Sequence, residues 1–190
     1  MNEIVKDRIF FQQSGGGVTC SGGEPLQQPE FLLSVLWACR RRSIHSCVET
    51  SGCAPWPIMN AVARLADLVL FDLKVMDPAI HRRLTGVDNG PILDNLRRLA
   101  GARRAFRVRV PVITGVNDQR SNTAALGRFL RGLPGLRGVD LLPFNGLCRE
   151  KYHRLKRRFA FAPLLPPSDK ALQRLRQRLA SYGIEASIGG

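Results

Sequence analysis

The chain alternates short apolar runs with longer segments of helical period, and this alternation limits its fold more than any other feature. GVTCSG, HSCVETSG and LVLFDLK are the first three apolar runs, and AFRVRVPVI, VDLLPF and IEASIGG follow later. Segments with helical spacing separate most of these runs, which is typical of repeated strand and helix units with parallel strands. No internal repeat, low-complexity tract or linker divides the 190 residues. We therefore expect one α/β domain that covers residues 1–190.

The composition excludes several other classes of protein. Hydrophobic residues make up 44% of the chain and charged residues 23%, which are values of a globular protein. No apolar run is long enough to span a bilayer, and the first residues lack the pattern of a signal peptide. We expect a cytoplasmic protein with reduced thiols, whose spacing matches no zinc or iron-sulfur motif. The cysteines are Cys20, Cys39, Cys47, Cys53 and Cys148.

The net charge is strongly positive. The sequence holds 29 basic and 15 acidic residues, a formal charge of +14, which favours polyanions or an acidic partner surface. The densest basic run is REKYHRLKRR, residues 149–158. A solvated helix face and a nucleic-acid contact are two interpretations of this run, but no RNP, zinc-finger or helix-turn-helix pattern accompanies it. The run by itself therefore does not lead us to expect a nucleic-acid partner.

Polar residues end or follow four of five successive predicted strands, and Arg109 lies within the other one, AFRVRVPVI. The carboxyl ends of parallel strands in an α/β barrel face one mouth, where ligands bind, so these residues are candidate ligand contacts. A helix cap or a surface salt bridge remains the alternative for any one of them. In chain order they are Glu24, Glu49, Thr50, Asp72, Lys74, Arg109 and Asn145.

The glycine-rich stretch SGGGVTCSGGEP, residues 14–25, contains the first predicted strand. A Walker phosphate loop needs a lysine and a hydroxyl residue after its last glycine, whereas Gly23 is followed by Glu24 and Pro25. No GxGxxG fingerprint leads into a helix, and the strand-like VTC argues against a free linker. Backbone carbonyls beside one carboxylate suit an ammonium group, and glycines let the backbone approach it closely. We predict that this segment binds a cation such as the amino group of an amino acid.

The chain also carries a series of longer motifs. They are SGGGVTCSGGEPLQQPEFL, VETSG, LFDLKVMDPAIHRRLTGVDNGPILDNLRRL, RVRVPVITGVND, VDLLPFNGL, KYHRL and the terminal IGG. In order and spacing they resemble the activating enzymes of glycyl radical enzymes, which are radical S-adenosylmethionine proteins related to pyruvate formate-lyase activase. The resemblance covers essentially the whole chain.

This resemblance implies a fold, cofactors and partners. The fold is a partial (β/α) radical SAM barrel, and the cofactors are S-adenosylmethionine and a 4Fe-4S cluster. In the family, a 5'-deoxyadenosyl radical removes a hydrogen atom from a backbone glycine of a partner glycyl radical enzyme. The resemblance also implies a flavodoxin-type reductant.

Roles for individual residues follow from the same resemblance. Ser21, Gly22, Gly23 and Glu24 match the segment that holds the amino group of the cofactor, which agrees with the cation site predicted from the residues themselves. Arg109 corresponds to a family arginine that faces the cofactor.

The remaining site residues also match family positions. Glu49 and Thr50 stand where the family has an acid and a threonine, beside the methionine moiety and a possible monovalent cation. Asp72 and Lys74 match the family's Asp-x-Lys, in which the lysine suits the cofactor carboxylate. Asn145 takes the place of a common family histidine, so an amide replaces the imidazole.

The resemblance is incomplete at the front of the chain. Family members carry an early CxxxCxxC motif that binds three irons of the cluster, and this sequence has none, so we assign no metal ligands. We expect an N-terminally truncated barrel that lacks its first strand and is inactive alone. A misassigned start or disrupted gene, a split protein and a genuine short protein with a changed role are three explanations. A non-catalytic binding module with a partner surface or a weak cofactor pocket remains the alternative function.

Overall fold

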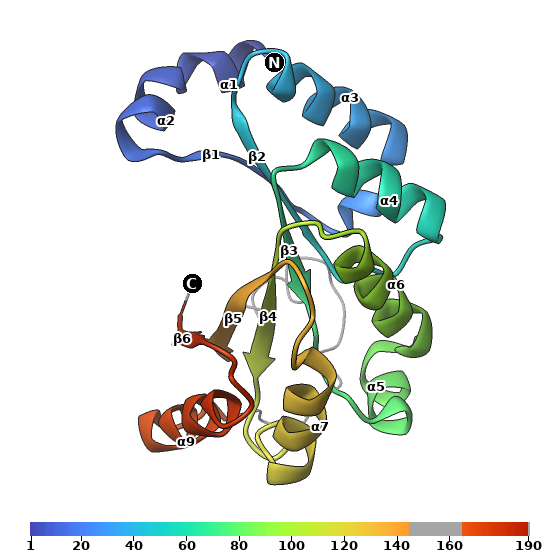
Figure 1. Ribbon diagram of the computed structural model, residues 1–190, viewed down its shortest axis with the longest axis vertical. Helices are drawn as coiled ribbons and strands as arrows, with labels where there is room; N and C mark the ends of the chain where they lie inside the picture. Colours follow the sequence, from blue (N-terminus) through green and yellow to red (C-terminus); the bar gives the residue numbers. More distant parts are fainter. Residues whose placement is uncertain (145–164, 190) are drawn as a thin grey trace, which may run out of the picture.

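The computed structural model describes residues 1–144 and 165–189, which form one curved parallel sheet with helices around it (Figure 1). Within these residues, six strands pair in the order in which they occur in the sequence. They are β1 (Gly17–Cys20), β2 (His45–Thr50), β3 (Leu68–Asp72), β4 (Phe106–Val112), β5 (Leu136–Pro143) and β6 (Ala186–Ile188). Each connection therefore moves the chain one strand along the sheet, as in a (β/α) barrel. The predicted α/β class is confirmed.

Two short helices precede β1, and further helices connect the strands. They are α1 (Asn2–Lys6), α2 (Arg8–Ser14), the 3-10 turn η1 (Pro25–Gln27), α3 (Pro29–Arg40), α4 (Trp56–Leu65), α5 (Pro78–Thr85), α6 (Gly90–Gly101), α7 (Arg120–Leu130) and α9 (Asp169–Ala180). Ser168 caps the last of these by accepting a hydrogen bond from the backbone N–H of Ala171. Gly183 lies just beyond that helix in the left-handed conformation, with φ of 74°.

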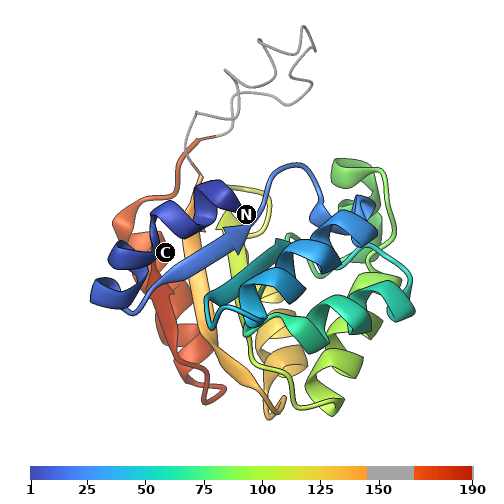
Figure 2. The same cartoon turned by 90° about the horizontal axis from the view of Figure 1, so that it is seen from above.

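The sheet separates an apolar layer from a polar one. In β4, Phe106 and Val108 are fully buried, whereas Arg107 and Arg109 alternate with them and point to the opposite, concave face. The helices between residues 29 and 101 lie side by side on the apolar side of the sheet (Figure 2). Along the described chain, β1 and β6 are the two edges of the sheet. The barrel is therefore partial, as expected.

Some sequence-based expectations fall on residues that the structure does not describe. Asn145, Cys148 and the basic run 149–158 lie outside the described residues. Within residues 1–144 and 165–189, no helix combines the length and apolar character that crossing a bilayer requires.

Candidate functional site

A polar hollow of about 180 Å³ lies at the carboxyl ends of β1, β2 and β3. These three ends meet because parallel neighbours run in the same direction. The hollow is lined by Ser21, Gly23, Glu24, Glu49, Thr50, Ser51, Asp72 and Lys74. The structure thus brings together most of the predicted site residues, and of the lining residues only Ser51 was not predicted.

The carboxylate of Glu24 joins the first two strand ends. Its Oε1 accepts hydrogen bonds from the hydroxyl of Thr50 at 2.6 Å and from the backbone N–H of Leu26 at 3.2 Å. Its Oε2 accepts from the backbone N–H of Ser51 at 2.9 Å and from the Ser51 hydroxyl at 2.6 Å. A carboxylate has about four lone-pair sites, so protein donors occupy all of them. Glu24 therefore ties the loops after β1 and β2 together, and the loop carbonyls are left as acceptors for a ligand.

The two glycines before Glu24 differ in what they require. Gly22 has φ of 135°, a conformation that residues with a side chain rarely adopt. At Gly23 φ is not positive, and an added Cβ would meet no atom within 4 Å. The backbone conformation explains why residue 22 is a glycine. At Gly23, the described protein leaves open space that a ligand could fill.

Arg109 of β4 lies between two carboxylates. Its Nε donates to Oδ1 of Asp72 at 2.9 Å, and its Nη2 donates to Oε1 of Glu49. Asp72 and Arg109 are direct neighbours in the register of β3 and β4, and the guanidinium crosses β3 to reach Glu49 on β2. The exposed fractions of the three side chains are 17% for Arg109, 29% for Glu49 and 24% for Asp72. These ion pairs are therefore partly shielded from solvent.

The shared guanidinium shifts the three pKa values in different ways. The hydrogen bond from Arg109 is the main cause that lowers the pKa of Glu49, and a hydrogen bond from Ser21 acts in the same direction. Burial raises the pKa of Asp72, and its contacts with Arg109 offset this rise only in part. Burial alone would lower the pKa of Arg109, but the hydrogen bonds with Glu49 and Asp72 outweigh it and raise this pKa. Of the two acids, Asp72 is thus the one for which the contacts with Arg109 do not fully offset the cost of burying the charge.

The chemistry of the hollow suits a ligand that carries both charges. Loop carbonyls and the free oxygens of Glu49 and Asp72 can accept hydrogen bonds from an ammonium group or from hydroxyls. Lys74 supplies an ammonium group that can pair with a carboxylate of the ligand. The residues therefore fit an amino acid moiety attached to a group with hydroxyls.

A second polar network lies beside the first on the concave face and was not predicted from the sequence. Asp140 of β5 accepts a hydrogen bond from Nε of Arg107 at 3.0 Å and one from the hydroxyl of Ser187 at 2.6 Å. Burial alone would raise the pKa of Asp140, but the hydrogen bonds from Arg107 and Ser187 outweigh it and lower this pKa. Asp140 pairs in register with Ser187 of β6, so this network fastens the last strand to the sheet.

Comparison with known proteins decides the family. The profile of the Radical SAM superfamily matches residues 1–126. The chain belongs to this superfamily. It is 38% identical over 195 residues to the (2S)-3-sulfopropanediol dehydratase activating enzyme of Klebsiella oxytoca, a match that spans 100% of this chain and 61% of that protein. It is 33% identical over 185 residues to the pyruvate formate-lyase 1-activating enzyme of Escherichia coli K12, spanning 96% of this chain and 75% of that protein.

A solved structure supports the same assignment. A domain of the pyruvate-formate lyase-activating enzyme from Bacteroides vulgatus superimposes with a TM-score of 0.79 and is 36% identical. The match covers 92% of this chain and 99% of that domain. The resemblance of the sequence to activating enzymes of glycyl radical enzymes is thus confirmed. The chain spans about six tenths of the length of the Klebsiella oxytoca relative.

The two cofactors that the superfamily implies fit the described residues differently. S-adenosylmethionine has an amino acid moiety and ribose hydroxyls, which match the acceptors and the lysine of the hollow. In the part of the chain that the structure describes, no group of three or more His, Cys, Asp or Glu residues is placed to hold a metal ion. A 4Fe-4S cluster therefore has no ligand set among these residues.

Proposed function

We propose that this chain binds S-adenosylmethionine in the hollow and acts in the activation of a glycyl radical enzyme. The observation that carries the proposal is the convergence of Glu49, Asp72, Lys74 and Arg109 at the carboxyl ends of adjacent strands. Membership of the Radical SAM superfamily identifies the ligand class that such an arrangement serves.

The hollow holds one end of the cofactor. Its volume of about 180 Å³ lies below the range of about 300 to 1,000 Å³ that is usual for whole small-molecule ligands. We assign it to the methionine moiety, with the carbonyls of Ser21 and Gly23 accepting from the ammonium group and Lys74 pairing with the carboxylate. Asp72 then accepts from hydroxyls of the remaining part, which extends over the open concave face.

Arg109 prepares the site before the ligand binds. It holds Glu49 as an anion, and it keeps Asp72 and Glu49 apart at fixed positions although both are negatively charged. When bound, S-adenosylmethionine supplies the hydrogen-abstracting chemistry. The residues of this chain bind it, orient it and set the charge of its surroundings.

The substrate in this proposal is a protein. The names of the relatives support this, since each activates another enzyme, such as a dehydratase or a formate-lyase. The formal charge of +14 favours an acidic surface on the partner. A flavodoxin-type protein is the proposed electron donor, in line with the family resemblance.

Calorimetry with S-adenosylmethionine tests the binding step. The wild-type chain should release or absorb heat that saturates, and Asp72→Ala should weaken binding by about tenfold because a hydrogen bond to ligand hydroxyls is lost. Asp94→Asn is the matched control, because it neutralises an exposed carboxylate on α6 that pairs with Arg98 outside the hollow. Equal affinities of Asp72→Ala and wild type would contradict the proposed site.

The activating step is tested in cells grown without oxygen. Deletion of the gene should remove the glycyl radical signal of the partner enzyme from the EPR spectrum, and its re-expression in the same cells, where other chains that could supply the cluster are present, should restore it. An unchanged signal after deletion would contradict the proposed activation.

A further inference from the structure

The loop that carries Lys74 is bonded to the sheet at its first residue, where the backbone N–H of Leu73 donates to the carbonyl of Arg109 in β4 at 2.9 Å. Residues 73–76 follow β3 and belong to neither a strand nor a helix. Buried backbone N–H and C=O groups need hydrogen-bond partners, and beyond Leu73 a loop of this kind must find them in side chains or water. In this protein, asparagine side chains supply them.

Two buried asparagines hold the carbonyls of this loop. Nδ2 of Asn117 donates to the carbonyl of Lys74 at 2.7 Å. Nδ2 of Asn89 donates to the carbonyls of Val75 at 3.1 Å and of Met76 at 3.0 Å. Asn89 is 2% exposed and Asn117 is 4% exposed, so water does not compete readily for these bonds.

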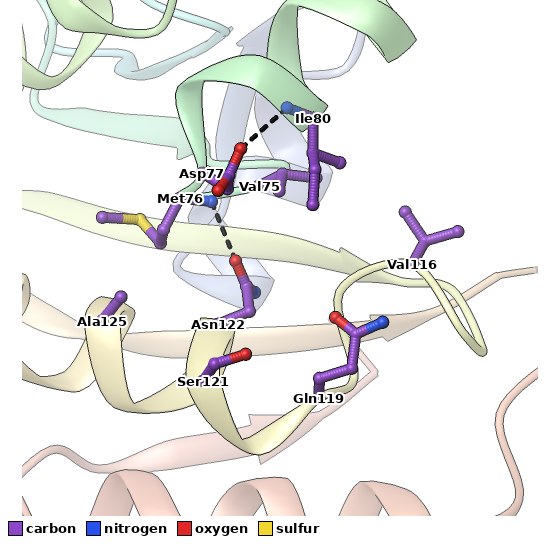
Figure 3. Close-up of a pocket in the computed structure, with 9 residues that line it drawn as sticks. All are labelled: Val75, Met76, Asp77, Ile80, Val116, Gln119, Ser121, Asn122 and Ala125. Atoms are coloured by element: carbon purple, nitrogen blue, oxygen red, sulfur yellow. Dashed lines mark hydrogen bonds between the residues drawn. The ribbon is translucent and has the colours of Figure 1, made fainter.

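A third asparagine holds the loop from the side of α7. Oδ1 of Asn122 accepts a hydrogen bond from the backbone N–H of Met76 at 2.8 Å (Figure 3). Nδ2 of Asn122 in turn donates to the carbonyl of Asn117 at 2.9 Å. Asn117 is anchored to β4 because its Nδ2 also donates to the carbonyl of Pro111 at 2.7 Å. We call Asn89, Asn117 and Asn122 the asparagine clamp.

Packing on one side of this loop is incomplete. A pocket of about 260 Å³ lies between α5 and α7, and Met76 and Asn122 form part of its wall (Figure 3). The side chain of Met76 packs against the hydrophobic core. Where open space borders the loop, the hydrogen bond to Asn122 also holds the Met76 backbone. Loss of the Asn122 contact would free the loop toward the pocket.

We propose that the asparagine clamp positions Lys74 in the hollow, and that Asn89, Asn117 and Asn122 are therefore positioning residues for the cofactor carboxylate. A lysine side chain is long and flexible, and binding through it loses less conformational freedom when its backbone is fixed. The clamp fixes the carbonyl of Lys74 itself and both polar backbone groups of Met76. The inference rests on the proposed function, in which Lys74 pairs with the carboxylate of S-adenosylmethionine.

A double-mutant cycle tests the connection to Lys74. Asn122→Leu removes the bond to Met76, and Asn122→Asp keeps an acceptor for it. We expect Asn122→Leu to raise the Kd for S-adenosylmethionine by about tenfold and Asn122→Asp to change it by less than about threefold. In a Lys74→Met background, Asn122→Leu should change the Kd by less than about twofold, because the group that the clamp positions is gone.

Thr123→Val is the matched control. Thr123 is the next residue in α7, is buried, and donates its hydroxyl to the carbonyl of Gln119 within the same segment. Its loss should change stability without any coupling to Lys74. If Asn122→Leu weakened binding equally with and without Lys74, the effect would be structural only and the positioning role would be overturned.

Hydrogen exchange separates this inference from the proposed function. Without cofactor, the amide of Met76 should exchange at least about tenfold faster in Asn122→Leu than in the wild type and Asn122→Asp. Equal exchange in all three proteins would overturn the clamp. Failure of the wild type to bind S-adenosylmethionine, with faster exchange in Asn122→Leu, would contradict the proposed function and leave the clamp supported.

Discussion

Arg109 is the residue on which the polar edge of the sheet depends most. One guanidinium serves Asp72 and Glu49, whose carboxylates come from the next two strands of the sheet, β3 and β2. Without it, two like charges would face one another in a partly buried place. Removing one partner of such a network leaves uncompensated charge, which costs more than the network contributes when intact.

We predict that Arg109→Met lowers the free energy of unfolding by about 2 kcal/mol, a value reduced from that of fully buried pairs because all three side chains keep some exposure. Urea denaturation at neutral pH measures this. Arg98→Met is the control, because Arg98 and Asp94 form a pair that is about half exposed, and it should cost less than about 1 kcal/mol. Equal losses would show that Arg109 acts as an ordinary surface cation.

Two aspartates on the concave face should respond to pH with opposite signs. The pKa of Asp140 is lowered from its ordinary value of 3.8, so its ionised form stabilises the fold above that value and this contribution is lost as the pH falls through the folded-state pKa. The pKa of Asp72 is raised from 3.8, so its contribution is present below that value and is lost as the pH rises through the folded-state pKa.

The predicted outcome is that the stabilities of the two variants differ at neutral pH and converge on that of the wild type in acid. At neutral pH, Asp140→Asn should be less stable than the wild type, and Asp72→Asn should be as stable or more stable. As the pH falls, the difference for Asp72→Asn should shrink first, because the pKa of Asp72 lies above 3.8, and the difference for Asp140→Asn should shrink at lower pH, because the pKa of Asp140 lies below 3.8. Thermal unfolding across the acid range measures this, and a loss of stability at neutral pH in Asp72→Asn would contradict the predicted sign for Asp72.

At the residue scale, the sequence predicts contacts only where position in a strand decides them. Glu49, Asp72 and Lys74 were predicted because residues at the ends of parallel strands share one mouth. Ser51 was missed although it directly follows Thr50, because a serine after a strand is usual in turns. The asparagine clamp was missed because its partners are backbone groups, which carry no sequence signal.

The loops after β1 and β2 make different demands on residue type. The positive φ at position 22 favours glycine there. Gly23 and Gly52 differ in the atoms that an added Cβ would meet. An added Cβ at Gly52 would overlap the ring of Phe71, which is fully buried. An added Cβ at Gly23 would meet nothing in the described protein.

We therefore predict that Gly23→Ala leaves the free energy of unfolding within about 0.5 kcal/mol of the wild type but weakens binding of S-adenosylmethionine by about tenfold or more. Gly52→Ala should instead lower the free energy of unfolding by about 2 kcal/mol or more, through overpacking and a positive φ. Chemical denaturation and calorimetry on the same samples distinguish the two. Unchanged binding in Gly23→Ala would show that the cofactor does not approach this backbone.

The strands could be predicted from the sequence more completely than the helices. Apolar alternation in FRVRVPV predicts β4 because one face of it is buried and the other faces the polar mouth. Residues 2–14 form α1 and α2, which were not predicted, and none of their residues is buried. A helix with no buried face has no need of a periodic hydrophobic pattern, so this pattern does not predict it.

At the scale of the whole molecule, the described residues include a candidate site for S-adenosylmethionine but no ligand set for a 4Fe-4S cluster. The hollow, the curved sheet and the family membership agree with each other. The five cysteines of the sequence show no CxxxCxxC spacing. Binding of S-adenosylmethionine in the hollow and assembly of a 4Fe-4S cluster can therefore be tested by separate experiments.

We predict that these 190 residues alone do not assemble a 4Fe-4S cluster. After anaerobic reconstitution with iron and sulfide, the absorbance and EPR signals of a cluster should stay far below one cluster per chain. A serine variant of Cys20, which packs against the core, serves as a control for adventitious thiolate binding. A stoichiometric cluster in the wild type would show that these cysteines suffice as ligands.

The central claim is that S-adenosylmethionine binds where the first three strands end. Two-dimensional NMR of the amide groups during titration with S-adenosylmethionine tests it most directly. The predicted result is saturable shifts confined to residues 21–24, 49–51 and 72–76, with the outer helices α3 and α4 unaffected. Absence of shifts at these strand ends, or saturable shifts centred elsewhere, would contradict the claim.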